Sequence, residues 1–193
     1  MSDTEDITQL ILRERQGRDR GWWHQMRDAY FPDSTVSLSW FTGSGPDFVR
    51  ESEAMSGRGD RAVHRLGPPI VQCEGDRAFA EVATAIDFQI TWDGVPVHLT
   101  SFTRLYYRLE KRAGHWGILD LTAVYERDTL TPAIPDQTIT IPPDTIRNLR
   151  PSYALLALHL NRRGYPTPPN LLGDDTPDAV TTSLQHWLHP TPT

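Results

Sequence analysis

The chain has 193 residues, a formal net charge of −6 and 38% hydrophobic residues, a profile typical of a globular protein that buries its own core. The negative charge argues against a broad nucleic-acid-binding surface, and no apolar run approaches the roughly 20 residues that span a membrane. The single cysteine, Cys73, excludes an intrachain disulfide and a cysteine-based zinc site. With a polar N-terminus unlike a signal peptide, the sequence predicts a cytoplasmic protein.

The first residues of the chain predict two short helices. Ser2 and Glu5 have the spacing of a capping box, and apolar residues then recur at helical spacing. Gly17 and Gly21 are expected to bracket a break, after which residues 22–30 form a second helix.

A strand and a third helix are expected next. Pro32 should end the second helix, because the residue before a proline avoids the helical region. Alternating residues at 36–41 predict a strand, and Pro46 is well placed to begin a helix that runs to about Met55. His64 follows in a short segment just before the next strand.

The middle of the chain predicts a run of long strands, at residues 70–74, 79–91, 97–110 and 116–126. Asp93-Gly94 is a strong hairpin signal, because the favoured two-residue turn needs positive φ at both positions. Lead-in helices followed by hairpin-linked strands favour an α+β fold over alternating α/β. We therefore expect a curved antiparallel sheet that curls into a cone over the N-terminal helices.

The composition changes after Arg127. Residues 131–151 are rich in proline and predict an extended connector. Residues 152–163 predict a helix, and Thr176-Pro177 opens a last helix that carries Val180, Leu184 and Trp187. We predict one domain at 1–131 and a Pro-rich connector with a helical C-terminal extension at 132–193.

Three stretches, in the right order, resemble the SnoaL-like, or nuclear-transport-factor-2-like, superfamily. They are residues 16–36 (QGRDRGWWHQMRDAYFPDSTV), residues 62–83, and residues 117–121 with 125–127. The resemblance implies a cystatin-like, cone-shaped α+β barrel, a homodimer, and an interior that holds a small hydrophobic metabolite. The superfamily includes dehydratases, polyketide cyclases and ketosteroid isomerases beside non-catalytic transport factors, so the fold alone does not fix the function.

His64 is the first candidate for the chemistry, with Asp87 as its expected partner. A neutral imidazole held by a carboxylate is a competent general base. Asp87 lies in mid-strand between apolar neighbours, and the resemblance implies a histidine at the position of His64 paired with a residue of that strand. The alternative is that Asp87 faces solvent, as polar or small residues at the other positions of its face suggest.

Asp19 and Arg127 are the other candidate catalytic residues. Asp19 falls at the expected turn between the first two helices, where the resemblance implies an acidic residue reaching into the cavity; the alternative is a helix cap. Arg127, at the end of the last strand, is suited to bind a carbonyl oxygen or carboxylate at the cavity mouth. It is equally suited to pair with Asp128 or Glu126 on the surface.

Aromatic side chains are the candidates for the substrate-binding wall, although most at such spacing belong to a core. The set is Trp22, Trp40, Phe48, Phe102 and Tyr106. The remaining histidines lack metal-ligand spacing, so neither a metal nor a cofactor is expected.

Two functions remain open. The first is a cofactor-independent dehydratase, isomerase or cyclase for a small hydrophobic oxygenated metabolite, such as a polyketide, terpenoid or steroid. The second is a non-catalytic small-molecule-binding or assembly module of the same fold, favoured if His64 and Asp87 point to opposite faces of the sheet.

Overall fold

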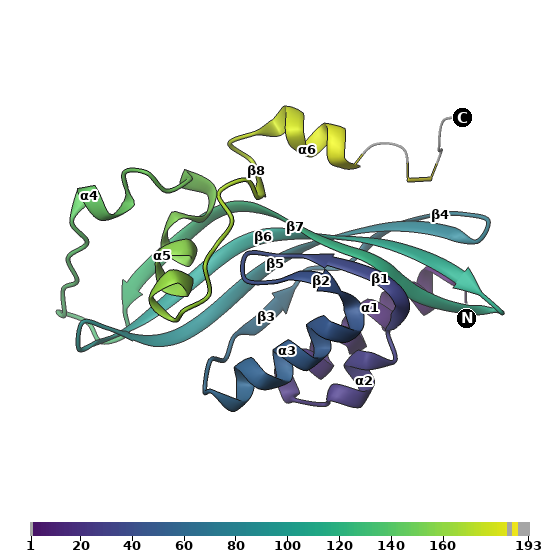
Figure 1. Cartoon of the computed structure of the whole chain (residues 1–193), viewed down its shortest axis with the longest axis horizontal. Coiled ribbons are helices and arrows are strands. Elements are labelled where there is room, and N and C mark those ends of the chain that lie inside the picture. The colour runs from purple at the N-terminus through teal and green to yellow at the C-terminus, as the bar shows by residue number, and fades with distance from the viewer. Residues whose placement is uncertain (1, 185–186, 189–193) are drawn as a thin grey trace.

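The computed structural model describes residues 2–184 and 187–188 (Figure 1). In chain order its elements are α1 (Asp3–Arg20), α2 (Trp23–Arg27), β1 (Tyr30–Ser37), β2 (Thr42–Ser44), α3 (Gly45–Gly57), β3 (Val63–Leu66), β4 (Ile70–Glu74), β5 (Arg77–Trp92), β6 (Val95–Arg112), β7 (His115–Pro132), α4 (Pro143–Ile146), the 3-10 turn η1 (Pro151–Tyr153), α5 (Ala154–Arg162), β8 (Leu172–Gly173) and α6 (Pro177–Leu184).

One curved sheet organises the molecule, with strand order β2-β1-β7-β6-β5-β3; β4 also pairs with β5, and β8 with β7. The predicted α+β class is confirmed, but the sheet is mixed rather than wholly antiparallel. Strands β1 and β8 both run parallel to β7, whereas the hairpin-linked strands β5, β6 and β7 are antiparallel. No sequence-local turn joins β1 to β7, so their parallel pairing left no hairpin signal to find.

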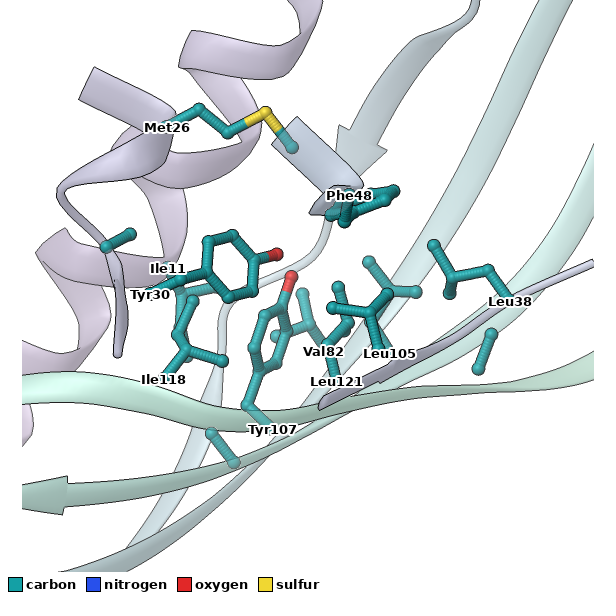
Figure 2. Close-up of a cluster of buried hydrophobic side chains, with 14 of the residues drawn as sticks. Ile11, Met26, Tyr30, Leu38, Phe48, Val82, Leu105, Tyr107, Ile118 and Leu121 are labelled. Atoms are coloured by element: carbon teal, nitrogen blue, oxygen red, sulfur yellow. The ribbon is translucent and has the colours of Figure 1, made fainter. Parts of the chain in front are cut away.

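The core lies between the sheet and the N-terminal helices. Helices α1, α2 and α3 all lie on one side of the sheet, and α6 lies on the other (Figure 1). Figure 2 shows Met26 and Phe48 from the helices packed toward Leu105 and Tyr107 of β6. Burying each such side chain contributes about 1.5–3 kcal/mol, so this layer holds the concave face of the sheet over the helices.

The first two helices differ from the prediction. The capping box at Ser2 and Glu5 is present, but α1 runs unbroken through Gly17 and ends at Gly21, whose φ is 71°. A Cβ on Gly17 would lie 3.0 Å from the Met26 backbone nitrogen, so this glycine permits close approach of α2 instead of breaking α1. Residues 30–33 belong to β1 and not to the end of α2.

The strand predictions for the middle of the chain are confirmed, with longer ends. Strand β4 has the predicted bounds, while β5, β6 and β7 each extend beyond theirs. Asp93 and Gly94 have φ values of 48° and 87° and turn the chain between β5 and β6, as the dipeptide predicted.

The C-terminal extension folds back over the open end of the sheet. Leu156 and Leu160 of α5 are buried in the main core, and Asp128 of β7 accepts a hydrogen bond from the Leu156 backbone N–H at 2.9 Å. This carboxylate satisfies one of the free N–H groups at the start of α5. The extension therefore packs directly on the sheet, while the boundary at residues 131 and 132 stays a prediction.

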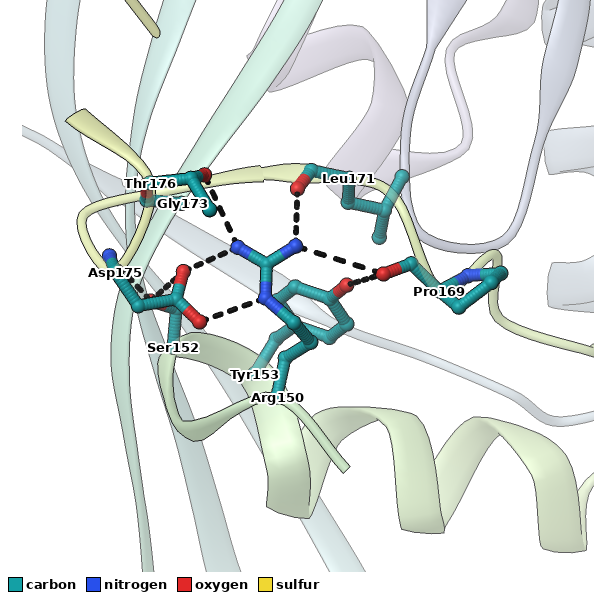
Figure 3. Close-up of polar contacts among 8 residues, drawn as sticks. All are labelled: Arg150, Ser152, Tyr153, Pro169, Leu171, Gly173, Asp175 and Thr176. Carbon is teal, nitrogen blue, oxygen red and sulfur yellow. Dashed lines mark hydrogen bonds and ion pairs between the residues drawn. The ribbon is translucent and has the colours of Figure 1, made fainter. Parts of the chain in front are cut away.

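A cluster of polar contacts around Arg150 joins the residues before α5 to the segment that follows it (Figure 3). The Arg150 guanidinium pairs with the Asp175 carboxylate and also donates to the Leu171 carbonyl at 3.1 Å, while Ser152 Oγ donates to Asp175 at 2.9 Å. Tyr153 adds a hydrogen bond to the Pro169 carbonyl at 2.9 Å. The loop from α5 to β8 is thus tied to the residues that precede α5.

The last helix is present as α6, but Trp187, which was predicted to belong to it, lies beyond its end. Trp187 Nε1 donates to the Ala78 carbonyl at 2.9 Å, and the guanidinium groups of Arg77 and Arg108 lie 5.0 and 6.0 Å from its ring. These contacts hold the described end of the chain against the outer face of the sheet, on the side of α6. The Leu184 side chain and residues 185–186, part of the predicted helix, lie outside the described residues.

The Gly45→Ala variant tests the packing of α3 against β1. The new Cβ would meet Ser34 Oγ and lie 2.7 Å from Tyr30 Cδ1, both in the buried layer. We expect a loss of about 1–3 kcal/mol in the free energy of unfolding, measured by urea denaturation. Gly57→Ala, at the far end of the same helix and with nothing within 4 Å of the new Cβ, is the matched control. It should gain up to about 1 kcal/mol, and equal losses in both variants would contradict the packing described.

Candidate active site

A cavity of about 380 Å³ lies between the concave face of the sheet, α1, α3 and α5. Its volume suits a small organic ligand. Most of its lining is apolar, from Leu38, Trp40, Phe48, Met55, Ile86, Phe88, Ile90, Trp92, Leu105, Ala123, Leu156 and Leu160. The polar part includes Arg15, Arg18, His64 and His159.

Asp19 and His64 form a hydrogen-bonded pair on the wall of this cavity. Asp19 lies in the last turn of α1, and His64 lies in β3, whose exposed neighbours Val63 and Arg65 point the other way. Asp19 Oδ1 lies 2.6 Å from His64 Nδ1, and Asp19 Oδ2 accepts the His64 backbone N–H at 2.8 Å. The side chains are 14% and 8% exposed, so the pair is largely withdrawn from water.

The surroundings fix the charges of this pair. Burial alone raises the pKa of Asp19, but the hydrogen bonds from the His64 ring and backbone outweigh it and lower the pKa below its usual value. Burial lowers the pKa of His64, the hydrogen bond to Asp19 opposes this, and the charges of Arg15 and Arg18 reinforce it. At neutral pH Asp19 is therefore ionised and His64 neutral. Because a carboxylate only accepts hydrogen bonds, Nδ1 carries the ring proton and Nε2 its lone pair.

The predicted partnership of His64 with Asp87 is wrong. Asp87 lies on the opposite face of β5 from the cavity-lining Ile86 and accepts hydrogen bonds from Arg65 Nε at 2.8 Å and Thr100 Oγ1 at 2.9 Å. Strand alternation explains the error, because Asp87 shares its face with Glu81, Ala83, Ala85 and Gln89, as the alternative interpretation held. The acidic partner is instead Asp19, which the sequence named separately.

Arg127 lies away from the cavity. It is exposed on the outer face, with its guanidinium carbon 3.9 Å from the Phe102 ring centroid. Neither suggested surface partner binds it: Glu126 accepts from Arg104 at 2.7 Å, and Asp128 faces the inner side toward α5. An irregularity in the pairing of β6 and β7 next to Phe102 accompanies this placement.

The predicted aromatic wall is partly right. Trp40 and Phe48 line the cavity with ring centroids 5.6 Å apart. Trp22 is 45% exposed, outside the cavity lining. Phe102 and Tyr106 fall on the even-numbered, outward face of β6, where Tyr106 packs on Phe79 at 5.5 Å. These two belong to the outer face, because odd-numbered residues of β6 supply the core.

Two buried arginines of α1 were missed by the sequence analysis. Arg15 donates through Nε to Glu14 Oε2 at 2.5 Å, and the Tyr30 hydroxyl donates to Glu14 Oε1 at 2.9 Å. Arg18, one turn on, also lines the cavity. The sequence did hold a signal for their burial, because positions 14, 15 and 18 continue the apolar face of α1 at helical spacing.

Polar contacts join the loop after α3 to the extension beside the cavity. The Tyr165 hydroxyl donates to Asp60 at 3.0 Å and accepts from Arg58 Nε at 2.9 Å, and Arg163 Nε donates to Asp60 at 2.6 Å. Asp60, Arg163 and Tyr165 also line the cavity, so the extension forms part of its wall. Within residues 2–184 and 187–188, no group of three His, Cys, Asp or Glu side chains gathers as metal ligands do.

The family model of the SnoaL-like domain matches residues 1–122. The chain belongs to this family. Among curated proteins, the PEP2-like protein of Fusarium vanettenii is 26% identical over 144 residues, covering 72% of this chain and 61% of that protein. An uncharacterized protein of Emericella nidulans is 25% identical over 147 residues, covering 72% and 62%. The chain thus spans about three fifths of the length of these relatives.

Solved structures of the same fold support the cystatin-like architecture. A hexachlorocyclohexane dehydrochlorinase, LinA type 2, has a TM-score of 0.58 and 12% identity, covering 71% of this chain and 94% of that one. A scytalone dehydratase-like protein from Novosphingobium aromaticivorans has a TM-score of 0.54 and 13% identity, covering 72% and 100%. A Nostoc punctiforme protein with a cystatin-like fold has a TM-score of 0.50 and 17% identity, covering 69% and 94%. No described helix is long and apolar enough to cross a membrane.

The Asp19→Asn variant tests which carboxylate holds His64. Removing the negative charge leaves burial and the two arginines to act on the ring, so the pKa of His64 should fall further. NMR titration of the histidine ring protons measures it. Asp87→Asn is the matched control and should leave the pKa of His64 unchanged. A shift in the Asp87 variant and none in the Asp19 variant would refute the pairing.

Proposed function

We propose that this protein is a cofactor-independent acid–base enzyme that acts on a small hydrophobic oxygenated metabolite, such as a polyketide, terpenoid or steroid. The observation that carries the proposal is a neutral His64, held by an ionised Asp19, on the wall of a mostly apolar cavity. An imidazole prepared in this way suits proton abstraction near neutral pH. Dehydration, isomerisation and cyclisation all begin from that step.

His64 would remove a proton from a carbon next to a carbonyl group. The lone pair on Nε2 accepts the proton, and Asp19 stabilises the imidazolium that forms while keeping the ring oriented. The same proton then goes to a departing hydroxyl group, giving dehydration, or to a different carbon, giving isomerisation. A positioned base of this kind contributes about 10²–10⁴-fold in rate.

The structural neighbours support a proton-abstraction chemistry. Dehydration and dehydrochlorination, the reactions in the names of two of them, are both eliminations that remove a proton from the substrate. Their identity to this chain is 12% and 13%, so the support comes through the shared fold and the Asp19–His64 geometry. We extend the proposal to a homodimer located in the cytoplasm. Sedimentation velocity of the purified protein would test the dimer, and cell fractionation would test the location.

The His64→Ala variant tests the catalytic assignment. Wild type and variant are screened by mass spectrometry against β-hydroxyketones, polyketide fragments and steroid enones. Any conversion found should fall by about 10²–10⁴-fold in the variant, because the base is gone. Conversion that survives in the variant would contradict the role of His64, and binding without conversion in the wild type would favour the non-catalytic binding module.

The pH dependence of kcat/KM follows from the same group. Proton abstraction needs neutral His64, whose pKa lies below its ordinary value of 6.5 because the ring is buried. The rate should therefore be flat through neutral pH and fall only in acid, below pH 6.5. An acid limb centred above pH 7 would show that a different group is the base.

A further inference from the structure

Arg18 is a buried cation without a full set of partners. Arg18 is 6% exposed and lines the cavity. A guanidinium has five N–H donors, and among the described residues the one hydrogen-bond acceptor for them is the Met55 thioether sulfur, 3.4 Å from Nη2. A thioether is a weak acceptor, so most of the donors of a desolvated charge stay available to a ligand.

Four other arginines line the cavity: Arg15 is buried, whereas Arg61, Arg162 and Arg163 are exposed to water. Arg15, equally buried, is held by the Glu14 carboxylate through two hydrogen bonds. Arg162 is more exposed and pairs with Asp93 at 3.2 Å. Arg18 faces the Trp40 ring at 5.9 Å, a contact with the cavity wall and not with a counter-ion. The described ion pairs do not include one between Arg18 and Asp19.

The charges near Arg18 select an uncharged substrate. The groups that act on it are Arg15, Asp19, Glu14 and Tyr165. The negative charge of Glu14 offsets the positive charge of Arg15. The negative charge of Asp19 offsets that of Arg18, although both Asp19 oxygens are hydrogen-bonded to His64. With His64 neutral, the buried charges around Arg18 therefore sum to zero, and an anionic substrate would add an uncompensated negative charge there. Arg61, Arg162 and Arg163 also line the cavity, but they are exposed and their charges are screened by water and salt. A neutral carbonyl compound keeps the balance, because its oxygen becomes negative only when His64 becomes positive.

We propose that Arg18 is the electrophile of this site, donating to the carbonyl oxygen of an uncharged, enolisable ketone next to the C–H bond that His64 attacks. This rests on the proposed function. As the C–H bond breaks, its electron pair forms a carbon–carbon double bond, the carbonyl π pair moves to oxygen, and the proton moves to Nε2. The enolate oxygen then accepts hydrogen bonds from the free N–H groups of Arg18. No oxidant or reductant takes part.

Binding of p-nitrophenol, an enolate mimic whose colour reports ionisation, tests the electrophile without catalysis. Wild type should bind it as the phenolate, with the phenol proton on His64 so that the charges stay balanced, and should lower its apparent pKa below the value in water. Arg18→Met, which replaces the cation by an apolar chain of similar length, should weaken phenolate binding at least about tenfold, the loss of one strong interaction. Nitrobenzene, which has no acidic proton, should bind both proteins alike.

Deuterium exchange at the α-carbons of 2-tetralone in D₂O, followed by NMR, tests the same residue in turnover. Arg18→Met should lower kcat by about 10²–10³-fold with little change in KM, because the carbonyl oxygen gains its charge after binding. Arg18→Lys keeps the positive charge but loses the planar guanidinium, so it should recover part of the rate. Such a recovery would show that misfolding does not explain the loss in Arg18→Met. Arg127→Met, at an exposed arginine on the outer face away from the cavity, is the control and should change neither binding nor exchange more than about twofold.

The outcomes separate the two proposals. Equal phenolate binding by wild type and a folded Arg18→Met variant, or a change in KM alone, overturns the role of Arg18. If no protein exchanges 2-tetralone but phenolate binding still depends on Arg18, the oxyanion site stands and the acid–base function falls. Exchange that depends on His64 and not on Arg18 upholds the function and refutes the electrophile.

Discussion

The site depends on one carboxylate, Asp19, which binds His64 twice. Its Oδ2 accepts the backbone N–H of β3 and its Oδ1 accepts the ring Nδ1–H. Because a buried carboxylate is costly without partners, these two bonds both stabilise the charge and fix the short edge strand to the end of α1. The same contact sets the tautomer of the imidazole, so one interaction joins the fold to the chemistry.

Helix α1 carries an unusual density of buried charge for an element that packs in a core. Glu14, Arg15 and Arg18 lie on the face that begins with Ile7 and Ile11. Glu14 and Arg15 satisfy each other, with the Tyr30 hydroxyl as a third member, and this leaves Arg18 directed to the cavity. Helix α5 covers the same space from the extension, so the charged wall works in an interior shielded from water, where each interaction is stronger.

Strand pattern and turn chemistry predicted most of the fold, because both are local. The Asp93-Gly94 turn and the alternation along β5 to β7 could be read directly. His64 and Asp19 were recognised singly, but their pairing joins residues 45 positions apart, and the nearer, plausible Asp87 was chosen without its strand face being decided. The parallel docking of β1 on β7 and the return of α5 over the cavity are long-range too, and nothing local encodes them.

The protonation state of the His64 ring decides whether this residue can act as the base. It can be measured from the two ¹⁵N chemical shifts of the ring in a long-range ¹H–¹⁵N correlation spectrum at pH 7. We predict a neutral ring with the proton on Nδ1, toward Asp19, and a bare Nε2. A doubly protonated imidazolium, or a neutral ring with its proton on Nε2, would contradict it, because His64 would then have no lone pair to offer a substrate in the cavity.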